Sequence, residues 1–250
     1  MEFYRALQTL WQFSDCDRRI QLRKYRKGLP EYVNFMKNNS MFFNEISKKI
    51  GWDCSNLHTF VNFANILAIE KRYNLNLSDW ITDDLYEKVQ NISDSGWDFI
   101  FGGGAFGIPK NDELIAINGG ILLGEMITNM EDVLIGKSKV RYHAYSGHDT
   151  SISSLLRTFG AKEAICGQSY PDYGSVVVVE LWKVSAGDYS VSVRYSDGEM
   201  TPFRTVTHLI EGCPLEEYCP FAKFIEQTRK YVVRDIKGKC EAVKTENPIL

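Results

Sequence analysis

Residues 146–150 read Ser-Gly-His-Asp-Thr and join a strand-like run to a helix-like run. A histidine beside an aspartate at such a turn can bind substrate and transfer protons. The N–H groups at a helix start, together with the helix dipole, attract an anion such as phosphate. His148 could then donate a hydrogen bond to a phosphoryl oxygen, and Asp149 could protonate a leaving oxygen at acidic pH. The alternative is structural, with Asp149 or Thr150 acting only as the helix N-cap.

Apolar spacing predicts the elements around this turn. A helix after the turn is indicated by residues at i, i+3, i+4 and i+7, namely Ile152, Leu155, Leu156 and Phe159. Gly160 is a suitable end for that helix. Residues 140–146 (VRYHAYS) predict a strand, residues 175–182 (SVVVVELW) a buried strand, and residues 189–195 (YSVSVRY) a strand of period two.

The first 110 residues read as helical, and residues 111–250 read as α/β. One apolar stripe within residues 30–51 contains Tyr32, Phe35, Met36, Phe43, Ile46 and Ile50, with Gly51 as its expected end. A second stripe contains Leu57, Phe60, Val61, Ala64, Leu67 and Ala68. Residues 77–93 predict a third helix capped by Ser78 or Asp79. Residues 112–135 predict a fourth, which carries Leu114, Ile121, Leu122, Met126 and Met130.

Composition and charge exclude several classes of protein. The chain has 250 residues, a net charge of −3 and 44% hydrophobic residues, which is ordinary for a globular protein. This charge favours neither a nucleic acid nor an acidic membrane surface as a partner. No apolar run reaches the roughly 20 residues of a membrane-spanning helix. The N-terminal stretch MEFYRALQTLWQF predicts an amphipathic helix and not a signal peptide, so the compartment of this chain stays open.

Six cysteines are spread along the chain without a C-x-x-C pair, which gives little support for a zinc site. Buried free thiols are one interpretation of these cysteines. The short spacing in CPLEEYC favours a local disulfide between Cys213 and Cys219. Three N-x-S sequons, at Asn38, Asn76 and Asn91, are typical of an exported protein.

The stretch FGGGAFGIPKND matches the spacing G-x-G-x-x-G at Gly102, Gly104 and Gly107. A dinucleotide fingerprint follows a strand and opens a helix, whereas Pro109 and charged residues follow this match. We therefore interpret it as a flexible loop.

Five segments resemble the histidine acid phosphatases of the prostatic and lysosomal type, in consistent order between Cys16 and Cys240. They are LNLSDWITDDLYEKV, INGGILLGEMITNM, YHAYSGHDTSISSLL, VVVELWKVSAGDYSVSVRY and LIEGCPLEEYCPFAKFIE. The resemblance implies a three-layer α/β/α histidine-phosphatase core in residues 111–250, present here incompletely. It also implies an α-helical cap region in residues 1–110. The family is secreted or lysosomal, hydrolyses phosphomonoesters at acidic pH without a cofactor, and is compatible with a homodimer.

The resemblance assigns roles to individual residues. Asp149 corresponds to the acid that protonates the leaving alcohol, and His148 to the histidine that contacts phosphate. Disulfides are implied for Cys16–Cys240 and Cys213–Cys219, with Cys54–Cys166 as a further pair. Cys166 lies several residues before the family's usual position, where this chain has Val176.

The family's nucleophile is missing from these residues. It is the histidine of an R-H-G-x-R-x-P motif, which forms a phosphohistidine. The four histidines here are His58, His143, His148 and His208, and none lies in an R-H-G. We expected His58 and His208 to be structural and His143 to pack against its neighbours.

In this family the R-H-G motif ends a central strand beside the His-Asp strand, so its absence should leave a sheet edge unpaired. The leading hypothesis is therefore a piece of an acid phosphatase that is inactive alone. The alternative is a non-catalytic homologue that acts as a binding or regulatory module. A metal-dependent His-Asp hydrolase is disfavoured because no histidine pair has ligand spacing.

Overall fold

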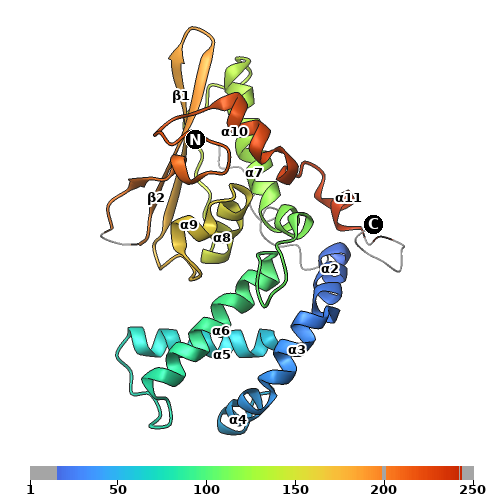
Figure 1. The fold of residues 1–250 in the computed structure, drawn as a ribbon. Helices are drawn as coiled ribbons and strands as arrows, with labels where there is room; N and C mark the ends of the chain where they lie inside the picture. Colours follow the sequence, from blue (N-terminus) through green and yellow to red (C-terminus); the bar gives the residue numbers. More distant parts are fainter. Residues whose placement is uncertain (1–15, 199–200, 242, 244–250) are drawn as a thin grey trace. The chain divides into compact units, whose positions relative to one another are not determined.

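A computed structural model describes residues 16–198, 201–241 and 243 (Figure 1). The predicted amphipathic helix at the N-terminus lies outside these residues. The chain divides into two compact units: residues 20–111 form one, and the described residues 16–19 and 112–243 belong to the other. The fold is mixed α/β, as predicted, with many helices and a small antiparallel sheet.

Residues 20–111 are helical, as the sequence predicts. The helices are α2 (Asp17–Gly28), which begins before the division, α3 (Pro30–Asn38), α4 (Ser40–Ile50), α5 (Leu57–Arg72) and α6 (Asp83–Phe101). The first predicted stripe is split between α3 and α4 at Asn39, whose side-chain amide donates a hydrogen bond to the Phe35 carbonyl at 2.9 Å. Gly51 ends α4 with φ 77°, which confirms the expected stop.

The predicted start of α6 is wrong. Ser78 does not cap a helix: its carbonyl accepts the Ile81 N–H at 2.8 Å and closes a turn. The N-cap is Thr82, whose hydroxyl accepts the Leu85 N–H at 3.2 Å. Three residues suited to N-caps, Ser78, Asp79 and Thr82, precede this helix, and the turn at Ser78 leaves Thr82 as the cap.

The glycine-rich loop after α6 is held in place, contrary to our expectation of flexibility. Gly102 ends α6 in the left-handed conformation, with φ 94°. The buried guanidinium of Arg26 donates to the carbonyls of Gly103 at 2.7 Å and Pro109 at 3.0 Å. Burial lowers the pKa of Arg26 to about 10, which leaves it charged at neutral pH. The loop follows a helix, so it lacks the strand that a dinucleotide fingerprint requires.

The unit formed mainly by residues 112–243 contains the sheet. Its elements are α7 (Asp112–Leu134), α8 (Asp149–Thr158), α9 (Lys162–Cys166), β1 (Val176–Ser185), β2 (Asp188–Ser196), β3 (Arg204–Thr205), η1 (Thr207–Leu209), β4 (Cys219–Pro220), α10 (Phe221–Thr228), η2 (Arg229–Tyr231) and α11 (Ile236–Cys240). The order of the antiparallel strands is β1-β2-β3, and β4 also pairs with β2. The predicted helix at 112–135 is confirmed as α7.

Strand β1 is less buried than the sequence predicts, and strand β2 is the buried one. The apolar strand β1 lies at the sheet edge, and Trp182 and Val184 are 42% and 65% exposed. The alternating strand β2 is central, and Val191, Ser192 and Val193 are fully buried. Among the described residues, β1 pairs only with β2 (Figure 1). Its outer backbone groups are therefore available to another strand.

Two adjacent glycines of α7 allow close packing. A Cβ on Gly119 would overlap the Ser154 carbonyl of α8, and one on Gly120 would overlap the Tyr231 carbonyl. The Gly120 carbonyl also accepts the Val233 N–H at 3.0 Å. The helix can approach its neighbours this closely only because these positions lack side chains.

The structure contains the disulfides Cys16–Cys240 and Cys213–Cys219. The further expected pair is not formed, because Cys54 and Cys166 are free thiols. They belong to different units, and each has its own neighbours: the Cys54 N–H donates to Ser47, and the Cys166 sulfur lies 3.5 Å from the Tyr195 hydroxyl. Burial raises the pKa of both thiols, which disfavours the thiolate that oxidation requires.

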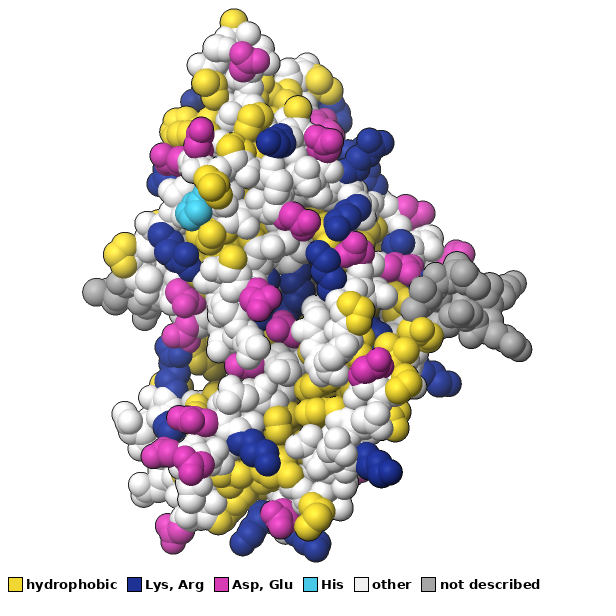
Figure 2. Space-filling view, in the orientation of Figure 1, with side chains coloured by type: hydrophobic (Ala, Val, Ile, Leu, Met, Phe, Trp, Pro, Cys, Tyr) yellow, Lys and Arg dark blue, Asp and Glu magenta, His cyan; other side chains and the backbone are white. Residues whose placement is uncertain are grey.

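The described part of the chain contains no helix suited to crossing a membrane and no cluster of residues suited to binding a metal ion. On the face shown in Figure 2, Lys and Arg side chains are interspersed with Asp and Glu.

A buried ion pair next to the Cys16–Cys240 disulfide makes stability depend on pH. The side chain of Arg18 is 5% exposed and donates to both carboxylate oxygens of Glu113. These hydrogen bonds hold the pKa of Glu113 below its usual value. The resulting stabilisation is fully present above the ordinary glutamate pKa and is lost as pH falls through the lowered pKa of the folded state.

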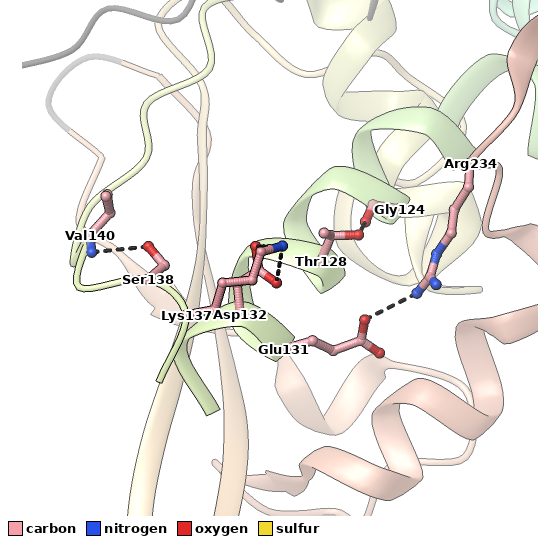
Figure 3. Close-up of polar contacts among 8 residues, drawn as sticks. All are labelled: Gly124, Thr128, Glu131, Asp132, Lys137, Ser138, Val140 and Arg234. Carbon is pink, nitrogen blue, oxygen red and sulfur yellow. Dashed lines mark hydrogen bonds and ion pairs between the residues drawn. The ribbon is translucent and has the colours of Figure 1, made fainter. Parts of the chain in front are cut away.

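We therefore expect Glu113→Gln to reduce the free energy of unfolding by about 1–2 kcal/mol at neutral pH, with the difference shrinking in acid. Urea unfolding across this pH range measures it. Glu131→Gln is the control, because the Glu131–Arg234 pair at 3.1 Å is exposed on both sides and should contribute little (Figure 3). Equal losses in the two variants, or a loss that does not change with pH, would contradict the expectation.

Candidate active site

The segment before the His-Asp turn is not a strand, contrary to prediction. Residues 138–148 form no helix or strand, and no other described strand pairs with them. Val140 and Tyr142 are 50% and 81% exposed. A strand forms only against a neighbour that accepts its backbone hydrogen bonds. The strand pattern of the sequence is thus present without its structural partner.

Local contacts hold both ends of this segment. At its start, Lys137 pairs with Asp132 at 3.0 Å, and the Ser138 hydroxyl accepts the Val140 N–H at 3.2 Å (Figure 3). Near its end, the Asn129 amide of α7 donates to the Tyr145 hydroxyl at 2.7 Å.

Tyr145 is the half-buried residue between exposed neighbours. Its burial and the charge of Glu125 raise its pKa to about 12, so the hydroxyl stays protonated. Sequence reasoning did not find the pairing with Asn129, because a single helical asparagine carries no signal of its distant partner.

Helix α8 begins at the predicted place, but its cap differs from the prediction. The N-cap is His148, with extended backbone (φ −119°, ψ 169°), and not Asp149 or Thr150. The His148 N–H donates to the Ser151 hydroxyl at 3.2 Å, and its carbonyl accepts the Ser151 N–H at 2.9 Å. Both hydrogen bonds use the backbone of His148, so the cap does not need its side chain.

Asp149 is the first residue of α8. Its carboxylate accepts the Thr150 N–H at 2.6 Å. Both His148 and Asp149 are exposed at the start of the helix, where the dipole favours a bound anion. The structure therefore brings these two predicted site residues together at one helix start, with their side chains accessible.

The other three histidines lie on other segments of the chain. His143 lies on the exposed segment, so the expectation that it packs is wrong. His58 is exposed on α5 and meets the Trp97 ring edge-on at 6.4 Å. His208 is exposed in η1.

Comparison with known proteins shows to which superfamily the chain belongs. The model of the histidine phosphatase superfamily (branch 2) matches residues 12–196, most of the chain. The chain belongs to this superfamily. The match includes the His148–Asp149 turn and the α7 glycines.

Among curated proteins, lysosomal acid phosphatase from Homo sapiens is 25% identical over 227 residues, covering 90% of this chain and 50% of the relative. Prostatic acid phosphatase from Bos taurus is 25% identical over 229 residues, covering 91% and 56%. An acid phosphatase-like protein from Xenopsylla cheopis is 25% identical over 194 residues, covering 71% and 48%. The chain is thus similar to acid phosphatases and spans about half the length of these relatives.

Proposed function

We propose that these 250 residues supply the phosphate-binding and proton-donating part of an acid phosphatase and do not hydrolyse phosphomonoesters alone. The observation that carries the proposal is the exposed His148–Asp149 pair at the start of α8, within a chain of this family. None of the four histidines lies in an R-H-G, so the family's nucleophile must come from another segment.

In the proposed reaction, a histidine nitrogen of an R-H-G-x-R-x-P segment attacks phosphorus, and the bond to the alcohol oxygen breaks. Asp149 donates its proton to that oxygen, so the alcohol leaves neutral. Water then attacks phosphorus of the phosphohistidine, the Asp149 carboxylate takes a proton from that water, the P–N bond breaks, and inorganic phosphate leaves. His148 donates to a phosphoryl oxygen throughout and stabilises the charge in the transition state.

The sheet supports the need for a second segment. The edge of β1 is open among the described residues, and residues 140–146 have a strand pattern without a partner. We propose that an additional strand, carrying the R-H-G motif at its end, completes this part of the core. Residues 1–110 would provide a cap that contributes to substrate choice. A homodimer and an exported or lysosomal location remain part of the proposal.

The first test compares the chain alone with a hybrid in which an R-H-G-x-R-x-P segment of a full-length relative precedes it. We expect the chain alone to release no phosphate from p-nitrophenyl phosphate at acidic pH. We expect the hybrid to release phosphate and to form a labelled, acid-labile phosphohistidine. Hydrolysis of an alkyl phosphate by residues 1–250 alone that is abolished by Asp149→Asn would overturn the proposal.

The missing nucleophile also favours a second candidate, a non-catalytic homologue that binds phosphorylated ligands at the same turn. A native protein that contains no R-H-G and binds inorganic phosphate without turnover would support it. His148→Ala should then weaken binding, whereas His208→Ala should not.

A further inference from the structure

A groove in the unit of residues 20–111 runs along one face of α6, and we call it the α6 groove. Its volume is about 520 Å³, and its lining consists of Phe35, Asn39, Asp84, Glu87, Lys88, Asn91, Ile92, Ser95 and Phe106. The α6 members are spaced three and four residues apart, so they form one stripe of the helix. Aromatic rings and amide groups therefore share a single hollow.

An aromatic pair contributes to the lining. The rings of Phe35 and Phe106 stack with centroids 4.0 Å apart. Phe106 has φ 56°, a left-handed conformation that is strained for a bulky residue. Reciprocal hydrogen bonds between Ala105 and Ile108, at 3.0 and 2.9 Å, close the turn that holds it. The Phe106 ring also packs against Tyr32 and Phe99, with centroids 6.1 and 5.8 Å away, so its position in the wall of the groove is fixed.

Asn91 is both a member of this lining and the acceptor of an N-x-S sequon. It is exposed on α6, and Ser93 completes the sequon. The two disulfides are typical of a protein that folds in an oxidising compartment, which is also where N-glycosylation occurs. The sequon and the groove are independent observations that meet at one residue.

We propose that Asn91 carries an N-linked glycan whose first N-acetylglucosamine lies in the α6 groove. The apolar face of a pyranose ring packs on an aromatic ring. The aromatic face is electron-rich and attracts the polarised C–H groups of the sugar. The Asn39 and Ser95 side chains provide polar groups suited to the sugar's hydroxyl and acetamido groups. This inference does not rest on the proposed phosphatase chemistry.

The other two sequons serve as internal controls. Asn76 lies in the exposed loop between α5 and α6, and Asn38 is exposed at the end of α3. Neither residue lines the α6 groove. A glycan at either position would extend into solvent and should leave the stability of the fold unchanged.

The test uses the full chain, secreted from eukaryotic cells behind an added signal peptide and bearing high-mannose glycans. Asn38→Gln and Asn76→Gln leave Asn91 as the one sequon, and endoglycosidase H trims its glycan to a single N-acetylglucosamine. We expect the Asn91 peptide to carry that sugar. We expect further substitution of Asn91→Gln to lower the Tm by about 2–4 °C. In a Phe106→Ala background, this difference should disappear.

Three outcomes would overturn the proposal. The first is an unmodified Asn91 in a chain whose Asn76 is glycosylated. The second is a Tm difference that survives Phe106→Ala, or none at all. The third is binding of free diacetylchitobiose to the groove with Asn91 unmodified in secreted protein, which would identify a site for free saccharides. In the chain that keeps all three sequons, Asn76→Gln is the matched control and should not change the Tm.

Discussion

Asp149→Asn is expected to reduce kcat/KM of the hybrid phosphatase for alkyl phosphates by about 10²–10⁴-fold. An alkoxide is a poor leaving group, so the reaction requires a proton at the leaving oxygen as the P–O bond breaks. The asparagine amide keeps the size of the side chain but has no such proton to transfer. Steady-state phosphate release at acidic pH measures the effect.

Two substrates with different leaving groups show whether Asp149 is a proton donor or has only a structural role. A nitrophenolate leaves without protonation, so kcat/KM for p-nitrophenyl phosphate should fall much less than kcat/KM for an alkyl phosphate in the same variant. The first turn of α8 should survive the change, because the asparagine oxygen can still accept the Thr150 N–H that Asp149 accepts at 2.6 Å.

Asp79→Asn is the matched control, since Asp79 is an exposed aspartate in the loop before α6. It should leave kcat/KM unchanged for both substrates. Equal losses of kcat/KM for the alkyl and nitrophenyl substrates in Asp149→Asn would show that Asp149 is not the proton donor.

Sequence patterns predicted the helices well because their signals are local. The apolar stripe of α5 and the span of α7 agree with the structure, and Gly51 ends α4 as expected. Helix starts were less predictable. Ser78, Asp79 and Thr82 are all residue types that cap helices, and a turn at Ser78 selects Thr82.

Strand burial was not predictable, because it depends on neighbours far away in the sequence. The valine run of β1 has the pattern of a central strand, yet β1 lies at an edge among the described residues. Residues 140–146 have a strand pattern but no described partner. The same limit applies to the candidate site. His148 and Asp149 were visible as neighbours, whereas the anchoring of Tyr145 by Asn129 was not.

Gly120→Ala is expected to lower the free energy of unfolding by about 3 kcal/mol or more. The added Cβ would overlap the Tyr231 carbonyl, which is backbone and has no rotamer that relieves the contact. Moving α7 away would also break the hydrogen bond from the Val233 N–H to the Gly120 carbonyl. Urea unfolding of the purified variant measures the loss.

Substitutions at two further glycines test whether the loss of stability comes from the packing contact at Gly120. A Cβ at Gly124 would lie 2.8 Å from the Val233 carbonyl, so Gly124→Ala should be destabilising by a smaller amount and should remain measurable if Gly120→Ala does not fold. A Cβ at Gly28, in the last turn of α2, would meet nothing within 4 Å. Alanine there should stabilise by up to about 1 kcal/mol, because it has the higher helix propensity. If Gly120→Ala were as stable as Gly28→Ala, the close approach of α7 to the segment after α10 would be wrong.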